Sequence, residues 1–549
     1  MEHSSANTLQ DERSKINPKA FWPGYIVLLV FIGTGLANLD AFKAVLDACK
    51  VWLVLNTGWF NVWSSLLIVL FTFGVAFSPI GNIRLGGKDA KPEYTLWQWF
   101  SMALCGCIGI GILFWAMGEP IFHMMEPPQA LGIESQSREA GIFGISQAIL
   151  HWSVAQYCIY TISGVAIALV AYNMRYPLSV AAGLFPIFPR ASRPVMTAVV
   201  HSLCLFSLCC AVACSMGAGL LQIGSGIGYL FNITPGKVVW GLVAALIVTL
   251  YTFSSATGIK KGMRILSAQC TRMFMGFMLF ALIVGPTLFI LTIGTETLGY
   301  LLNNFFRNST LLNAMIPEST WCDNWIIIFM ASFFIYAPLL GTFLARLGRG
   351  RTVRQFILVN VLPPTFFVYV WMSVFGGTAV SFQWSGVFDV WQSVQQNGLE
   401  STIFVLFSQF PFSSIVIALF IVTVIISFVT LADPMTSVLA TISTKGLQVE
   451  DEAPRRLKLV WGITAGTVAY LLVASGGVDS LRGMLMLAGF PLMLVTCLLC
   501  ASTVKTGLEL ISIPGNFIDK SHEFEQDARA ERLPDEASLI KERSQNTLA

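Results

Sequence analysis

Long apolar runs recur along almost the whole chain, and no other feature limits its possible folds as strongly. A helix needs about 20 apolar residues to cross the hydrocarbon core of a bilayer. Twelve runs are candidates for such spans, at residues 21–39, 58–80, 97–118, 143–172, 196–231, 238–257, 265–293, 323–345, 355–383, 402–432, 457–475 and 482–504. Only 11% of the 549 residues are charged, whereas a soluble domain has about 25%. The sequence therefore predicts an all-α, multi-pass membrane protein and excludes a cytosolic enzyme.

Basic residues alternate between the loops as a membrane topology requires, because cytoplasmic loops carry an excess of Lys and Arg. With the N-terminus inside, the basic residues on the cytoplasmic side are Arg13, Lys15, Lys19, Arg84, Lys88, Lys91, Arg175, Arg190, Arg193, Lys260, Lys261, Arg264, Arg346, Arg349, Arg351, Arg354, Lys445, Arg455, Arg456 and Lys458. The outer segment 119–142 has only Arg138, and 384–400 has no basic residue. The first outer loop, with Lys43 and Lys50, fits least well. The pattern predicts twelve spans and two cytoplasmic termini.

The polar ends of the chain define three regions. Residues 1–20 form a cytoplasmic N-terminal tail, 21–504 the membrane domain, and 505–549 a cytoplasmic C-terminal tail. This last tail is acidic, with six Lys or Arg against nine Asp or Glu. The basic loop 346–354 either fixes the topology and contacts phospholipid or serves as a docking surface for the acidic tail.

Motifs of catalysis and nucleotide binding are absent from the sequence. The five histidines are His3, His123, His151, His201 and His522, and no two have the spacing of metal ligands. We therefore expect no cofactor and no metal, and a carrier, a channel or a receptor rather than an enzyme. Glu119, beside Pro120, is expected to be a structural hydrogen-bonding residue, and His151 to be packed or hydrogen-bonded within the bundle.

Glycines concentrate in the third apolar run, which reads ALCGCIGIGILFWAMGEP. Gly106, Gly109 and Gly111 weaken the helix and bare backbone carbonyls, a feature of the broken helices at which carriers hold substrates. Close packing between helices through small residues explains the same pattern equally well.

Two runs carry aromatic stripes. The stripes are Trp152, Tyr157 and Tyr160 in the fourth run, and Trp325, Phe329, Phe333 and Tyr336 in the eighth. Facing each other with no acid between them, they would form a cage for a quaternary ammonium, each ring contributing about 0.5–2 kcal/mol when desolvated. The alternative is that they are ordinary core or lipid-facing aromatics.

Four motifs in order along the chain resemble the betaine/choline/carnitine transporter family. They are GEP at 118–120, HWSVAQYCIY at 151–160, the aromatic stripe of the eighth run, and FLARLGRGRTVRQF at 343–356. The resemblance runs from about residue 15 to 505. It implies a leucine-transporter-type fold, with two peripheral helices and two inverted five-helix repeats at about 97–293 and 323–504. It also implies alternating access, a homotrimer and a bacterial inner membrane.

The resemblance assigns substrate-binding residues by motif. These are Trp152, Tyr157, Tyr160, Phe333 and Tyr336, with Trp325 matching a second, outer tryptophan site in the carnitine branch. The eighth run has fewer tryptophans here than is usual in the family, and position 157 is often Trp there. Since Phe and Tyr are weaker partners for a cation, the family pattern does not fix the identity or the affinity of the substrate here.

Sodium sites of the family lack oxygen ligands here. Thr430 remains, but Leu431 and Leu340 stand where side-chain oxygens are expected, and Cys105 and Ile108 face the first site from the third run. Sodium needs oxygen ligands, as other hard cations do. The chain is therefore expected to work without sodium.

Arg272 lies inside the otherwise apolar seventh run. A central arginine costs about 2.5–3.5 kcal/mol on insertion scales and normally faces an interior partner. The carnitine antiporter branch is similar in having a buried arginine in this span, where sodium would sit. We therefore expect Arg272 to brace the third span against the tenth, with Asp433 or carbonyls near Gly109 as partners. The alternative is that Arg272 snorkels to water.

These inferences favour a secondary carrier that exchanges quaternary-ammonium compounds without sodium, such as L-carnitine against gamma-butyrobetaine. An alternative in the same class is cation-coupled uptake of glycine betaine, choline or a sulfonium analogue. A channel or a substrate sensor on the same scaffold is the alternative from another class.

Overall fold

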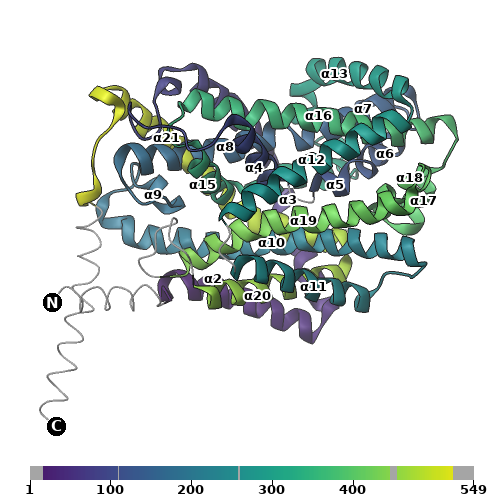
Figure 1. Cartoon of the computed structure of the whole chain (residues 1–549), viewed down its shortest axis with the longest axis horizontal. Coiled ribbons are helices and arrows are strands. Elements are labelled where there is room, and N and C mark those ends of the chain that lie inside the picture. The colour runs from purple at the N-terminus through teal and green to yellow at the C-terminus, as the bar shows by residue number, and fades with distance from the viewer. Residues whose placement is uncertain (1–15, 109–110, 257–259, 445–453, 524–549) are drawn as a thin grey trace, which may run out of the picture.

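The computed structural model describes residues 16–108, 111–256, 260–444 and 454–523. Within these ranges nearly every residue is helical, and the only β-pairing is two isolated bridges, Ile16 with Thr444 and Arg84 with Thr352. The helices run mostly side by side along the longest axis (Figure 1). This architecture confirms the predicted all-α fold class, and its physical cause is that backbone groups in hydrocarbon must bond within their own helix.

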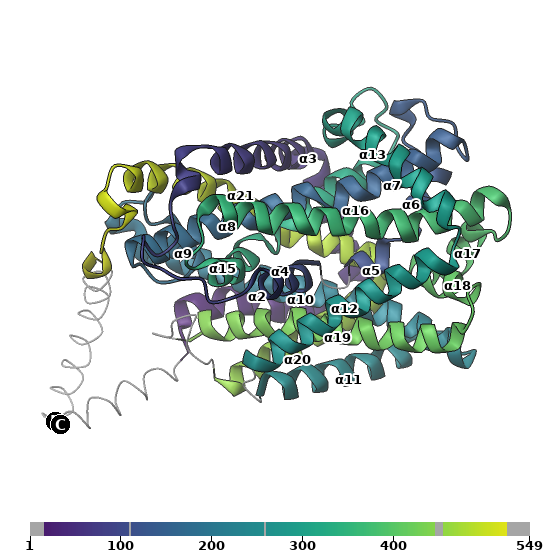
Figure 2. The same ribbon diagram turned by 45° about the horizontal axis from the view of Figure 1, so that its top comes forward.

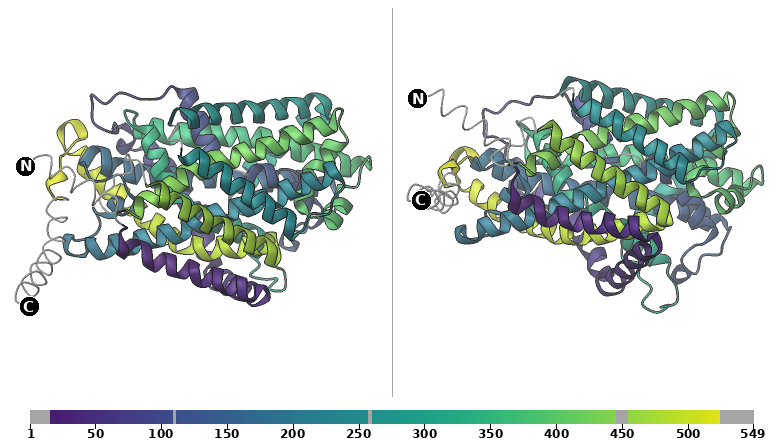
Figure 3. Two further views of the ribbon diagram at one scale, coloured as in Figure 1. Left: turned by 60° about the horizontal axis from the view of Figure 1, so that its bottom comes forward. Right: turned by 90° about the horizontal axis from the view of Figure 1, so that it is seen from below.

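The first half of the chain, to residue 309, forms twelve of the α-helices described. They are α2 (Pro18–Ala37), α3 (Leu39–Phe77), α4 (Leu96–Ile108), α5 (Gly111–Trp115), α6 (Gly118–Met125), α7 (Arg138–Trp152), α8 (Val154–Ala168), α9 (Val180–Leu184), α10 (Arg193–Phe231), α11 (Lys237–Ala256), α12 (Lys260–Val284) and α13 (Thr287–Ser309). Of these, α2 and α11 lie on the outside of the bundle, and α13 lies along the opposite edge (Figures 1 and 3).

The second half begins with a π-helical turn, η5 (Asp323–Ile327), and continues through eight further α-helices in the described residues. They are α14 (Ile328–Phe334), α15 (Ala337–Gly348), α16 (Val353–Ser385), α17 (Val390–Asn397), α18 (Thr402–Ser408), α19 (Ser413–Ile442), α20 (Arg455–Gly476) and α21 (Val478–Ile511). A capping box of Thr352 and Gln355 starts α16, each side chain bonding the other's backbone.

Nine helices of the described residues are long and apolar enough to cross a membrane, and the bent pair η5–α14 and α15 makes ten. The remaining two expected spans fall on α4 with α5, which residues 109–110 separate, and on α11, whose apolar part is shorter. The twelve-span topology thus stays a prediction, although each expected run coincides with a helix or a broken helix.

Three predicted boundaries are wrong. The seventh run does not continue to residue 293, because Gly285 and Pro286 end α12 and a separate helix, α13, follows. The first outer loop, with Lys43 and Lys50, is helical, because the Asn38 side chain accepts bonds from the amides of residues 40 and 41 and starts α3 there. The tenth run is interrupted at residues 409–412, between α18 and α19.

Two breaks fall in the helices that begin the two expected repeats. In the second, α14 and α15 meet at a bend of 51°, and Pro338 lies in the first turn of α15, where its missing N–H costs no helical bond. In the first, α5 ends at Trp115 and α6 begins at Gly118, with a turn at residues 116–117 between them. Discontinuous helices of this kind build midplane binding sites in carriers.

The centre of the bundle is α8, whose residues are buried almost throughout, and which packs on α15, α16, α3 and α21 (Figure 2). Glycines let the backbones of α8 and α15 approach closely. A Cβ on Gly341 would lie 2.7 Å from the amide nitrogen of Gly164 and 2.7 Å from the Cβ of Ser163. This contact fixes the bend region of α14 and α15 against α8, where the aromatic stripes meet.

The segment after α21 docks on a basic loop, but not on the expected one. Glu523 pairs with Arg190 at 2.6 Å and with Arg193 at 3.5 Å, and Asp519 pairs with Arg175 at 3.1 Å. The loop 346–354 instead packs on the loop 83–94, where Arg84 Nη1 donates to the carbonyl of Gly350 at 2.8 Å. Docking of tail residues 512–523 on the 346–354 loop is therefore wrong, and residues 524–549 lie outside the described part.

Replacing Gly341 by Ala should lower the free energy of unfolding by about 1–3 kcal/mol, because an added methyl group forces the two backbones apart. The matched control is Gly276→Ala in α12, where nothing lies within 4 Å of the added Cβ. This control should be neutral or stabilise slightly. The readout is the thermal unfolding midpoint in detergent. Equal midpoints for the two variants would contradict the close approach.

The contacts of Glu523 predict a pH dependence. Burial alone would raise its pKa, but hydrogen bonds from Tyr176 and Arg190 and the positive charges of Arg190 and Lys520 lower the pKa to about 2. A lowered pKa stabilises the fold above the ordinary value near 4.5, and this stabilisation is lost as pH falls toward 2. Glu523→Gln should therefore unfold at a lower temperature than the wild type at pH 7, with a difference of about 1 kcal/mol. The difference should shrink between pH 4.5 and pH 2. A difference independent of pH would contradict this account.

Candidate functional site

A cavity of about 730 Å³, part of it open to solvent, lies where α5, α8, α10, α14, α19 and α21 converge. Six aromatic rings line it: Phe114, Trp115, Trp152, Tyr160, Phe333 and Tyr336. The other lining residues are Cys107, Gly111, Gln156, Cys214, Ser215, Ala218, Ser332, Leu431, Val478, Leu481, Arg482 and Leu485. The lining thus contains one charged side chain, Arg482, and no carboxylate.

A hydrogen bond and close packing fix the position of Trp152 in the cavity wall. It is the last residue of α7, where the chain turns at Ser153 before α8 begins. Its indole Nε1 donates to Glu119 Oε2 at 2.8 Å. Gly111 leaves space for the ring, since a Cβ there would lie 2.4 Å from a ring carbon of Trp152. The ring therefore has one orientation, fixed by a charge-assisted hydrogen bond and by packing.

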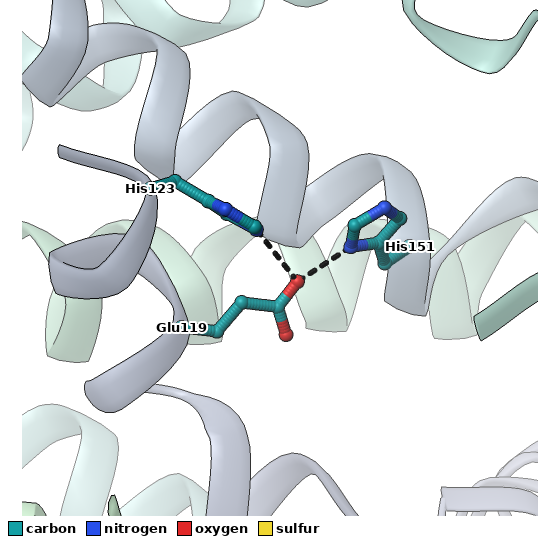
Figure 4. A group of neighbouring side chains, drawn as sticks. All are labelled: Glu119, His123 and His151. Carbon is teal, nitrogen blue, oxygen red and sulfur yellow. Dashed lines mark hydrogen bonds and ion pairs between the residues drawn. The ribbon is translucent and has the colours of Figure 1, made fainter. Parts of the chain in front are cut away.

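Glu119 is the centre of a buried polar cluster (Figure 4). Its Oε1 accepts from Nδ1 of His151 at 2.6 Å and lies 3.4 Å from Nε2 of His123. All three side chains are fully buried. The His151 ring stacks on Phe329, with centroids 4.7 Å apart and an interplanar angle of 4°. The expectation that Glu119 and His151 are hydrogen-bonded structural residues is confirmed by these contacts.

Sequence spacing missed this cluster because His123 on α6 and His151 on α7 are far apart in the chain. The carboxylate oxygen and the two ring nitrogens lie within 4.8 Å of one another, as in a small metal site. Each of these three atoms also takes part in a contact within the cluster. Hydrogen bonding thus accounts for the arrangement without a metal ion.

The second stripe faces the first across the cavity. The ring of Phe333 lies 6.0 Å from Trp152 and 6.4 Å from Tyr160, in both cases edge to face. The Tyr336 hydroxyl is 2.8 Å from Ser215 Oγ and 3.0 Å from the carbonyl of residue 211, which holds this ring at the bend between α14 and α15. The structure therefore brings together four of the six predicted rings.

Tyr157 does not line the cavity. The lining face of α8 carries Gln156 and Tyr160, which are four residues apart and so point the same way. Tyr157 is rotated by about 100° from Gln156, and its buried hydroxyl has no hydrogen-bond partner among the described residues. The geometry therefore gives no support to the predicted substrate contact of Tyr157, which stays a prediction.

Trp325 also lies outside the lining, and its ring is already covered. Phe329 stacks on it with centroids 5.9 Å apart, the His123 ring lies 4.4 Å away, and the guanidinium carbon of Arg482 lies 4.9 Å from its centroid. The outer onium site predicted on this ring stays a prediction without support from this geometry, because the guanidinium of Arg482 already lies over the ring.

Arg272 is exposed on α12 and donates to Gln269 Oε1 at 2.8 Å. The inward position belongs to the preceding residue, Thr271, whose hydroxyl lies 3.2 Å from the Cys105 sulfur of α4. One residue along a helix is a rotation of about 100°, so the arginine points outward. The predicted bracing of the third span against the tenth by Arg272 finds no support in this geometry and stays a prediction. Of its expected partners, the side chain of Asp433 and all of Gly109 lie outside the described part.

The positions expected for sodium are poor in free oxygens. Leu431 lines the cavity and Leu340 is buried. The Thr430 hydroxyl donates to the carbonyl of Ser427 in its own helix at 2.8 Å. The side chain of Ile108 lies outside the described part.

Two functional candidates were missed from the sequence, Trp115 and Arg482. The guanidinium carbon of Arg482 lies 5.1 Å from the ring centroid of Trp115, which shares the cavity wall with it. A usable signal existed: Arg482 is a lone charge in the apolar run LRGMLMLAGF, so the rule applied to Arg272 selects it equally well.

Comparisons with known proteins agree on one family. The model of the betaine/carnitine/choline family transporters matches residues 19–509. A probable glycine betaine transporter of Desulfitobacterium hafniense is 30% identical, covering 87% of this chain and 95% of the relative. The glycine betaine transporter OpuD of Bacillus subtilis is 30% identical, covering 88% and 93%. The high-affinity choline transport protein of Escherichia coli is 27% identical, covering 90% and 72%.

Replacing Glu119 by Ala should lower the free energy of unfolding by about 1–3 kcal/mol, because the buried N–H groups of Trp152 and His151 lose their acceptor. The control is Glu296→Ala, which removes an exposed pair with Arg138 at 2.6 Å. Such surface pairs contribute about 0–1 kcal/mol. Thermal unfolding in detergent compares the two variants. A Glu119 variant as stable as the control would contradict the role given to this carboxylate.

Proposed function

The chain belongs to the betaine/carnitine/choline transporter family, and from this premise we propose that it exchanges betaines, such as L-carnitine and gamma-butyrobetaine, without sodium. As a family member it is a multi-pass membrane transporter of small quaternary-ammonium compounds and not an enzyme. The finer proposal concerns the substrates, the coupling and the assembly.

The observation that carries the proposal is the aromatic wall without an acid. An onium headgroup in the cavity would contact Trp152, Tyr160 and Phe333, whose rings meet edge to face. Each ring contributes about 0.5–2 kcal/mol to a desolvated cation. A trimethylammonium group has no N–H to donate, so ring faces suit it better than hydrogen-bond acceptors.

The lack of oxygen ligands supports sodium independence. The side chains of Leu431 and Leu340 have no oxygen, and Cys105 of α4 presents a sulfur atom. Hard cations bind oxygen, whereas thiolates suit soft metals. Arg272 has no part in this proposal. Without a coupling ion, an outward substrate gradient drives the inward movement of another betaine.

Alternating access around the cavity fits the two broken helices. The bend of 51° between α14 and α15 lies beside Phe333 and Tyr336. We propose that movement at this bend opens the cavity to each side in turn, in a homotrimer in the bacterial inner membrane. Both termini would be cytoplasmic, since the start of α2 and the segment after α21 lie at the same end of the bundle (Figure 1).

Cation-coupled uptake of glycine betaine or choline is the second candidate. The names of three relatives support its substrates, since two are called glycine betaine transporters and one a choline transport protein. The two candidates differ in what drives uptake, so one assay separates them.

The test is uptake of labelled L-carnitine into proteoliposomes loaded with gamma-butyrobetaine, in sodium and in potassium buffers. We expect uptake that needs internal substrate and is equal in both buffers. Trp152→Ala should reduce uptake at least about tenfold through loss of ring contacts. Trp59→Ala should not, because that ring lies on the outside of α3 with 58% of its surface exposed.

A requirement for a sodium gradient would overturn the exchange proposal and favour coupled uptake. Transport that shows no saturation and no stimulation by internal substrate would indicate a channel. Binding without any transport would indicate a sensor.

A further inference from the structure

A permanent positive charge lies in the wall of the cavity. Arg482, in the second turn of α21, lines the cavity beside Leu481 and Leu485. Its side chain is 15% exposed. An arginine in a membrane-embedded interior is costly, and it is a functional candidate by default.

The described contacts of Arg482 are with aromatic rings, and they leave at least one N–H donor without a hydrogen-bond partner. The guanidinium carbon lies 5.1 Å from the ring centroid of Trp115 and 4.9 Å from that of Trp325. Contacts with ring faces do not use the N–H groups in the guanidinium plane. The Nε atom is buried and has no hydrogen-bond partner among the described residues. Among the described residues, the planar fork that binds carboxylates in a bidentate manner therefore keeps its Nε donor unpaired.

The acids near Arg482 do not form a hydrogen bond with it among the described residues. Asp479 Oδ1 lies 3.7 Å from Nη1, beyond hydrogen-bond distance, and its side chain is 64% exposed. Water screens such an exposed partner, and Asp479 also lies within electrostatic range of Lys50. The oxygens of Glu119 already accept from Trp152 and His151.

The cavity thus offers aromatic rings for an onium group and an unmatched cation for an anion. A ligand with a positive charge alone would meet the repulsion of Arg482 with no acid in the lining to offset it. A zwitterion brings the missing anion and loses its own solvation more cheaply, because both of its charges find partners.

We propose that Arg482 binds the carboxylate of a zwitterionic onium substrate, so that the carrier selects betaines against choline and other ligands that lack an acidic group. This inference rests on the proposed function, because it names the substrate class of the same cavity. The rings hold the onium end, and the guanidinium fork holds the carboxylate end.

The test is equilibrium binding to the purified full-length protein, measured by calorimetry. The ligands are L-carnitine and glycine betaine, each paired with its methyl ester, which keeps the onium group and removes the negative charge. The wild type should bind each acid at least about tenfold more tightly than its ester, since hydrogen bonds to charged groups contribute at this level.

Arg482→Gln should reduce this acid-to-ester preference to near one, through weaker binding of the acid with ester binding kept or improved. Retained ester binding also shows that the variant is folded. Arg482→Lys keeps the charge without the fork, so it should show an intermediate preference. Arg272→Gln is the matched control, an exposed arginine on α12 whose loss should leave the preference unchanged.

An acid preference that persists in Arg482→Gln would overturn the inference. Equal binding of acid and ester by the wild type, or tighter binding of choline, would also overturn it and leave the proposed transport of onium compounds standing. If the wild type binds none of the four ligands and no choline, the proposed function fails, and the inference with it.

Discussion

The requirement that every backbone N–H and C=O in hydrocarbon finds a partner governs this molecule. It forces the described chain into helices and confines helix breaks to places where protein, and not lipid, surrounds the freed groups. The breaks at Ser153 and at the bend between α14 and α15 both lie in the buried interior. These are also the places where Trp152, Phe333 and Tyr336 reach the cavity. Because helix breaks are tolerated in the buried interior, the same requirement also determines where the cavity lies.

Some polar groups inside the bundle have their hydrogen bonds satisfied and others do not. We assign a structural role to the first kind and a functional role to the second. Glu119 is a buried carboxylate with three nitrogen atoms around it, so its oxygens are hydrogen-bonded and it orients Trp152 and His151. Arg482 is the opposite case, because it contacts aromatic rings while its buried Nε donor has no hydrogen-bond partner among the described residues. A charged group whose hydrogen bonds are satisfied stabilises one conformation, whereas a charged group with an unpaired donor beside a cavity favours the binding of a ligand.

Sequence reasoning located the helices and four of the cage rings, because apolar length and aromatic spacing are local properties of a helix. It failed where orientation decides the outcome. Arg272 and Thr271 are neighbours in sequence, yet one points outward and the other contacts Cys105. Nothing in one apolar run shows which face meets the bundle, so a lone charge such as Arg272 or Arg482 cannot be placed from its run alone. The pairing of His123 with His151 was missed for a related reason, since it depends on two helices meeting.

The central claim is that the ring-lined cavity binds the onium group of the substrate, and that the carboxylate of the same substrate points toward α21. A structure of the protein with the arsenic analogue of glycine betaine tests this most directly, because arsenic marks the onium centre by anomalous scattering. We expect the arsenic peak among Trp152, Tyr160 and Phe333, with the carboxylate density directed to Arg482. A peak outside this cavity, or on the outer face of Trp325, would contradict the assignment of the site.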